Sequence, residues 1–162
     1  MRTREFASQE SGSSILELAF SLPLFLLLIL GGAEIANIAW ASVQLNNAAH
    51  AAAQYASSIH ANASPTNSTN IEQAAKNEAP ALAATITFPN PPALLCSCLT
   101  QSTGAQTTPA SCTDFQTSCI SPNVILSSIQ ITTQAVVRPL VHYPGLPATY
   151  TLHAQATMGV VP

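Results

Sequence analysis

The first sixty residues carry one long apolar segment followed by an alanine-rich one. Residues 18–33 contain no charged side chain and consist mostly of Leu, Ile, Phe and Ala, a density typical of a membrane span. At about 1.5 Å per residue they cover roughly 24 Å, slightly less than the ~30 Å hydrocarbon core of a bilayer. Glu17 and Glu34, which bound the segment, are therefore expected near its two edges. The pattern predicts a helix over 13–60 that spans the membrane at about 16–40.

The second half of this helix has a different apolar pattern. Neither Gly nor Pro interrupts residues 43–60, and Ala is the best helix former. Its apolar residues recur at helical spacing and form a stripe on which a domain can pack. Because each Ala buries little area, the packed partner must approach closely. The stripe consists of Leu45, Ala48, Ala49, Ala52, Ala53, Ala56 and Ile59.

The remaining part of the chain, residues 61–162, alternates turn signals with short strand signals. Alternating apolar positions indicate half-buried strands, and Pro and Gly separate them. We expect the last two strands, which are close in sequence, to pair antiparallel. The expected elements are a connector at 61–70, a helix at 71–79, strands at 84–88, 124–133 and 136–143, and a strand from Tyr150 to Met158. The predicted fold class is α+β, a long membrane helix leading into one small antiparallel sheet domain.

All four cysteines lie in a polar segment, 93–122, which we expect to be a loop. A metal site is the alternative to disulfides, but the spacing matches no usual zinc pattern and the segment contains no His. A bond between the first two cysteines, which are two residues apart, would be strained. Each is therefore expected to pair with one of the last two, with the connectivity left open. The cysteines are Cys96, Cys98, Cys112 and Cys119.

Composition narrows the function. The 162 residues carry a formal charge of −3 and include only four Lys and Arg, too few for a nucleic-acid-binding surface. No catalytic, nucleotide-binding or metal-binding motif is present, and the His residues are scattered. We therefore expect no enzyme, no cofactor, no bound metal and no nucleic-acid partner.

Charge asymmetry predicts the orientation of the span. Arg2 and Arg4 precede it, and the next Lys or Arg in the chain is Lys76. The positive-inside rule then leaves the N-terminus in the cytoplasm and places the domain outside, in the periplasm or beyond. Cysteines that lie only in the outer part agree with a compartment that permits disulfides.

The entrance to the span is the candidate functional site. Residues 1–12 are polar and are expected to be a leader; retention of this segment is the alternative. Cleavage after Gly12 would create an amine on Ser13, one helical turn from the Glu17 carboxylate. That carboxylate could pair with the terminal amine of a neighbouring subunit. The alternative is that Glu17 only extends its side chain to the interface.

A short polar leader, Gly, four residues, Glu and an apolar helix resemble the processing site of type IV pilins and pseudopilins. The continuation LPLFLLLILGGAEIANIAWASVQLNNAAHAAAQYA and the closing run YPGLPATYTLHAQATM are similar to the TadE-like family of minor pseudopilins. The resemblance implies a subunit or assembly component of a tight-adherence (Flp type IVb) pilus in the inner membrane. Its implied partners are a prepilin peptidase, other pilin-like subunits, the inner-membrane assembly platform and membrane lipid. Because the family has a second glutamate just past the span, Glu34 joins Glu17 as a candidate assembly residue.

A secreted or anchored binding domain is the rival interpretation. Ala39-Trp40-Ala41 could serve as an A-x-A site for a Sec-type signal peptidase. The mature chain would then begin at Ser42 rather than Ser13 and would lack the membrane helix.

Overall fold

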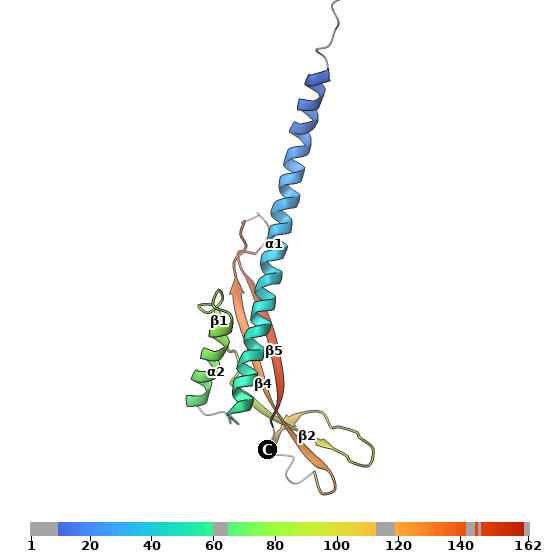
Figure 1. The fold of residues 1–162 in the computed structure, drawn as a ribbon, viewed down its shortest axis with the longest axis vertical. Coiled ribbons are helices and arrows are strands. Elements are labelled where there is room, and N and C mark those ends of the chain that lie inside the picture. The colour runs from blue at the N-terminus through green and yellow to red at the C-terminus, as the bar shows by residue number, and fades with distance from the viewer. Residues whose placement is uncertain (1–9, 60–64, 113–118, 142–144, 146, 161–162) are drawn as a thin grey trace, which may run out of the picture.

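A computed structural model of the chain describes residues 10–59, 65–112, 119–141, 145 and 147–160. It has the predicted α+β fold: one long helix, a short second helix and an antiparallel sheet (Figure 1). The elements are α1 (Glu10–Ser58), α2 (Pro65–Glu78), β1 (Ile86–Thr87), β2 (Ala93–Leu99), β3 (Ala110–Ser111), β4 (Val124–Val137) and β5 (Tyr150–Val160).

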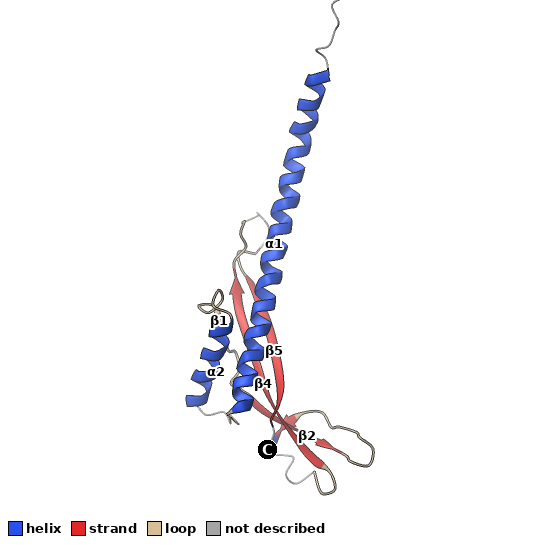
Figure 2. Ribbon diagram, viewed as in Figure 1, coloured by secondary structure: helices blue, strands red, loops and turns tan. Residues whose placement is uncertain are grey.

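Helix α1 is continuous over 49 residues and divides into two halves. It begins before Ser13, the expected first residue, and Pro23 does not interrupt it. Figure 2 shows the N-terminal half projecting away from the domain with no other element beside it. The C-terminal half lies against α2, β4 and β5. The N-terminal half of α1 is therefore an unpacked apolar helix, called the apolar rod below, and the C-terminal half is part of the packed domain.

The sheet is organised around β4. Strand β5 pairs with β4 over Ser127–Val137, and β2 pairs with β4 over Val124–Gln130. Since both partners pair with the residues shared by these ranges, they lie on opposite edges of β4. The two-residue β1 pairs at Gln134 and Ala135, where β5 also pairs, so β1 follows β2 along the same edge. All of these pairings are antiparallel, as expected.

The structure corrects the prediction of two strands at 124–133 and 136–143. Strand β4 is a single strand that ends at Val137, just before Pro139. Proline has no N–H to donate to the sheet, so it ends the strand instead of interrupting a second one. The antiparallel partner of β5 is therefore the whole of β4.

Two further boundaries differ from the expectation. Part of the expected cysteine loop is the seven-residue strand β2. Helix α2 begins at Pro65, within the expected connector 61–70, because Pro is well suited to the first turn of a helix, where its missing N–H has no partner to lose.

The core lies where the alanine stripe of α1 meets the sheet and α2. Leu45 and all five alanines of the predicted stripe are fully buried, whereas Ile59, at its end, is 38% exposed. The predicted face of β5 is also the inward one, with Ala154 and Ala156 buried between exposed neighbours. Other members of this core are Ile71, Ala75, Ala79, Ile86, Ile129, Ile131 and Ala135. Small side chains on both surfaces let the helix lie close to the sheet, so many weak contacts replace a few large ones.

Candidate assembly site on the N-terminal helix

The entrance residues all lie in the first turns of α1. Gly12 and Ser13 belong to the helix, and the structure describes only their backbone. Glu17 follows one turn later and its side chain is exposed. It has no hydrogen-bond or ion-pair partner among the described residues. Its carboxylate is therefore available to a group from another molecule.

The segment that follows Glu17 is apolar on all its sides. Large residues such as Phe20 (79% exposed) and Ile29 (65% exposed) face outward with no protein beside them. Within the described residues, α1 is the one helix long and apolar enough to cross a membrane. An unpacked helix that is hydrophobic all round is stable only in an apolar medium. The structure is thus consistent with anchoring by a single membrane-spanning helix.

Glu34, at the other end of the apolar segment, contacts the domain. Its Oε2 accepts a hydrogen bond from the backbone N–H of Leu140, at 2.7 Å. Its Oε1 is buried and has no partner among the described residues. Sequence reasoning missed this contact, because the two residues are separated by 106 positions and Leu140 participates only through its backbone.

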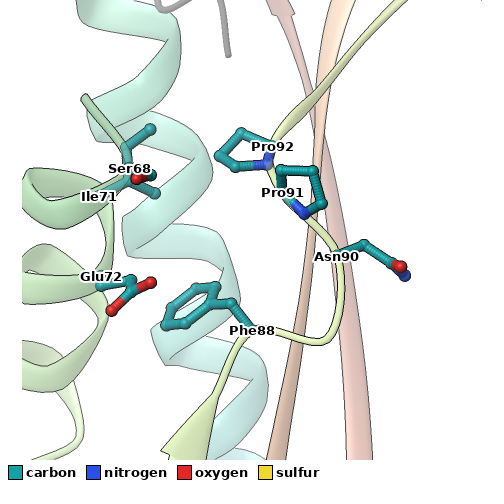
Figure 3. A pocket seen from close by; sticks show the side chains of 7 residues that line it. All are labelled: Ser68, Ile71, Glu72, Phe88, Asn90, Pro91 and Pro92. Atoms are coloured by element: carbon teal, nitrogen blue, oxygen red, sulfur yellow. The ribbon is translucent and has the colours of Figure 1, made fainter. Parts of the chain in front are cut away.

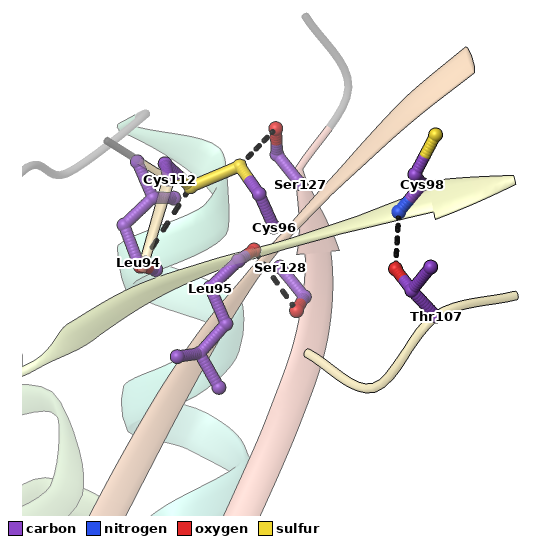
Figure 4. The surroundings of a disulfide bond; sticks show 8 residues. All are labelled: Leu94, Leu95, Cys96, Cys98, Thr107, Cys112, Ser127 and Ser128. Atoms are coloured by element: carbon purple, nitrogen blue, oxygen red, sulfur yellow. Dashed lines mark hydrogen bonds between the residues drawn. A yellow bond between two sulfur atoms is a disulfide. The ribbon is translucent and has the colours of Figure 1, made fainter. Parts of the chain in front are cut away.

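The four cysteines form two disulfides at the end of the domain remote from the apolar rod. Cys96 bonds to Cys112, and Cys98 bonds to Cys119 (Figure 4 shows the first bond). Both bonds link β2 to the segments that follow it, as the spacing predicted. The backbone N–H of Cys98 also donates a hydrogen bond to the Thr107 hydroxyl, at 2.9 Å. These links connect the outer strands to their loops, where little apolar surface is buried.

A shallow cavity of about 220 Å³ lies between α2 and the segment joining β1 to β2. In Figure 3 the ring of Phe88 points toward Glu72 and Ile71, whereas Asn90 points away. Of the described residues that line it, Glu72 is the one carboxylate, and the Lys76 ammonium, one turn along α2, lies 3.7 Å from this carboxylate. Across the described residues, no three His, Cys, Asp or Glu side chains gather as metal ligands would. This cavity offers no pair of groups for acid–base chemistry.

The comparison with protein families concerns α1. Residues 12–54 match the family model for TadE-like proteins. The matched range begins at Gly12, the predicted processing position, and ends within the buried alanine stripe. No curated protein and no solved structure matches the chain. The resemblance predicted from the sequence is therefore confirmed for the helix that carries the entrance site, whereas the closing run YPGLPATYTLHAQATM lies outside the matched residues.

The match also bears on the class of protein. The TadE-like family is a family of structural pilus components and not of enzymes. Proteins of that family are pilin-like components associated with tight-adherence pili, and this chain is similar to them over residues 12–54. The sheet domain, beyond residue 54, lies outside the match.

Proposed function

We propose that this chain is a non-enzymatic, pilin-like subunit or assembly component of a tight-adherence pilus. A prepilin peptidase removes residues 1–12, and the mature chain begins at Ser13. The helix stays in the inner membrane with its N-terminus toward the cytoplasm, and the sheet domain lies outside. Other pilin-like subunits and the inner-membrane assembly platform are its protein partners.

One observation carries this proposal: the family match includes the whole N-terminal half of α1 that the domain leaves uncovered, and continues into the packed half. A helix that served only to stabilise the domain would need its apolar surface only where the domain packs, at residues 41–58. The additional apolar turns before Trp40 contribute nothing to the core of the domain. Membrane lipid and, in a filament, neighbouring helices are the surroundings that such a surface requires.

The proposed role of Glu17 follows from its exposure and its position. In the mature chain it is four residues from the terminal amine of Ser13, about 6 Å along the helix axis. An exposed carboxylate in an apolar surface is unfavourable until a cation neutralises it. The terminal amine of a neighbouring subunit supplies that cation and fixes the relative height of the two helices.

The rival secreted form fits the structure less well. Its cleavage motif, Ala39-Trp40-Ala41, lies in the middle of a continuous helix, and Ala41 is only 4% exposed. A mature chain beginning at Ser42 would lose Glu34 and with it the hydrogen bond to Leu140. The uncleaved anchor, which retains the leader, conflicts with none of these contacts.

The mass of the mature protein distinguishes the three forms. We would express the full chain with and without a prepilin peptidase and measure intact masses from the membrane fraction. A peptidase-dependent mature chain beginning at Ser13 supports the proposal. A chain beginning at Ser42 favours the secreted form, and an intact leader under both conditions favours the uncleaved anchor.

Gly12→Leu and Gly32→Leu form a matched pair of variants for this experiment. The peptidase must hold the substrate backbone closely at position 12, which Gly permits because it has no Cβ. Gly12→Leu is therefore expected to block maturation. Gly32 lies further along the same helix, where an added Cβ would meet nothing within 4 Å. The second variant is therefore expected to mature normally. Normal maturation of Gly12→Leu would exclude this cleavage site.

A further inference from the structure

The loop between β4 and β5 reaches further along α1 than any other described part of the domain (Figure 1). Its backbone is attached to the helix through the Leu140 N–H and the Glu34 carboxylate, at 2.7 Å. The Leu140 side chain is not used in this contact and is 65% exposed. The domain thus presents an apolar side chain beside the end of the membrane span.

The position of this contact relative to the bilayer can be estimated from the helix rise per residue. Glu34 lies 17 residues after Glu17, or about 26 Å along the axis at about 1.5 Å per residue. If Glu17 marks one edge of a hydrocarbon core about 30 Å thick, Glu34 lies within a few Å of the opposite edge. Leu140, bonded to Glu34, is then at the same depth. The loop therefore reaches the level of the bilayer boundary and does not stay above it.

The surfaces that face each other at this level are apolar. A cavity of about 310 Å³ opens between the helix and the loop. Among the described residues, Glu34 is the only charged one that lines it, and its Oε2 already accepts the Leu140 N–H. The boundary patch consists of Gly31, Ile35 and Ile38 from α1, and Pro139, Leu140, Val141 and Pro147 from the loop, with Tyr150 at the start of β5.

Residues around the boundary patch are those that favour a membrane interface. Arg138, which precedes the patch, is exposed, and a guanidinium can reach lipid phosphate. Trp40 is 65% exposed and lies about 9 Å beyond Glu34 along the helix, where an indole is favoured at the headgroup level. The lipid-facing surface of α1 is therefore continuous with the patch.

We infer that the boundary patch is a second membrane contact, covered by the acyl chains of the outer leaflet. Glu34 is its positioning residue: it holds the loop backbone against α1 so that Leu140 enters the lipid. The domain is thereby fixed in height and tilt relative to the bilayer, which a single helix crossing does not achieve. This inference requires that α1 spans a membrane, and it is independent of processing after Gly12.

Depth-dependent fluorescence quenching tests this contact. The chain has a single Trp, so Trp40→Phe provides a dark background. In that background, Leu140→Trp would be placed in nanodiscs of phosphatidylcholine brominated either near the glycerol or near the methyl end of its acyl chains. We expect blue-shifted emission that is quenched more strongly by the shallow bromines. Ile120→Trp, at an equally exposed apolar position (70%) in the distal part of the domain, should show water-like emission without quenching.

Leu27→Trp, in the middle of the apolar segment, reports on the span itself, and it should be quenched most by the deep bromines. Quenching at Leu27→Trp but not at Leu140→Trp would overturn the second contact and leave the span intact. Absence of quenching at both would overturn both. Blue-shifted but unquenched emission from Leu140→Trp would mean that protein, such as a second copy of the chain, covers the patch, and would overturn the assignment to lipid.

The role of Glu34 is tested in the same Leu140→Trp background. Glu34→Gln retains an oxygen that can accept the Leu140 N–H, whereas Glu34→Ala removes it. We expect Gln to preserve the shallow quenching and Ala to reduce it, with quenching at Leu27→Trp unchanged in both. Equal quenching with Ala and Gln would exclude Glu34 as the positioning residue.

Discussion

The two halves of α1 have the same secondary structure but are stabilised by different surroundings. Before Trp40 the helix exposes large side chains, such as Phe20 at 79%, whereas Leu45, one turn beyond Trp40, is completely buried. The backbone hydrogen bonds of a helix are satisfied within the helix, whether lipid or protein surrounds it. The difference is therefore in the side chains: they are bulky in the half that is suited to lipid, and small where another part of the protein must come close.

This comparison predicts that the same substitution will have different effects in the two halves. Leu45→Ala should lower the stability of the domain by about 2 to 5 kcal/mol, because it leaves a cavity in the core. Leu24→Ala changes a side chain that is 61% exposed and outside the domain, so it should leave domain stability nearly unchanged. Amide hydrogen exchange in β4 and β5, measured in nanodiscs, reports the opening free energy. Equal protection of the β4 and β5 amides in the two variants would contradict the view that only the C-terminal half of α1 stabilises the domain.

The distal part of the sheet, formed by β2, β3 and their loops, contrasts with both halves of the helix, because two disulfides link its segments. No described residue of 93–122 belongs to the main core cluster. Replacing Cys98 and Cys119 together by Ala should therefore destabilise this region by about 2 to 4 kcal/mol, as loss of a disulfide commonly does. Exchange in β2 should increase much more than exchange in β5.

Thiol alkylation provides the chemical control for the disulfide prediction. The native chain should be labelled only after reduction, when all four thiols react, because each cysteine is bonded. The double variant should be labelled at two positions after reduction. Labelling of the native chain without reductant would show that the bonds do not form in the membrane protein.

Enlarging a small side chain should also affect the two halves of α1 differently, with a smaller change in domain stability. Ala52 is fully buried, so Ala52→Leu should destabilise the domain by about 1 to 3 kcal/mol as the helix is pushed from the sheet. Ala33 is exposed in the apolar half, and Ala33→Leu should be tolerated. The thermal unfolding midpoint in detergent compares them. If Ala33→Leu lowered the unfolding midpoint as much as Ala52→Leu does, α1 would also be tightly packed at position 33.

The sequence predicted features that depend on regular spacing. The apolar segment, the alanine stripe and the inward face of β5 follow from periods of 3.6 and 2 residues, and the structure has all three. The extent of β4 was not predicted, because Pro139 was interpreted as a break within a second strand when it marks the end of the first. Strand β2 was missed because polar neighbours of the cysteines favoured a loop.

The contact between Glu34 and the loop could not be predicted in this way. It depends on a backbone N–H, which every residue except proline carries, and on a chain reversal that brings together residues 106 positions apart. The sequence indicated only that a carboxylate at the end of an apolar span needs a partner. Identification of the partner required the paths of both β4 and β5.

Glu17 has no such partner in the part of the chain that the structure describes, and in this it differs from Glu34 at the other end of the apolar segment. Glu34 is satisfied in part by the Leu140 N–H, whereas Glu17 is exposed on the apolar rod. If Glu17 pairs with the Ser13 amine of a neighbouring subunit, Glu17→Gln should preserve the shape, insertion and cleavage while removing a charge-assisted hydrogen bond. The amine left unpaired should weaken assembly by about 1 to 3 kcal/mol. Co-purification with pilin-like partners, at matched membrane level and mature mass, measures this loss.

Glu34→Gln is the comparison variant for this experiment, because Glu34 is the other candidate assembly residue and a Gln oxygen can still accept the Leu140 N–H within one subunit. We expect it to recover partners normally while Glu17→Gln does not. Full recovery of partners by both variants would reduce Glu17 to a side chain that extends to the interface, because a neutral Gln should insert there at least as well as Glu. An equal loss in both would indicate instead that Glu34, the second candidate assembly residue, also contributes to assembly. The intersubunit pairing is assigned to Glu17 only if Glu17→Gln loses partners and Glu34→Gln does not.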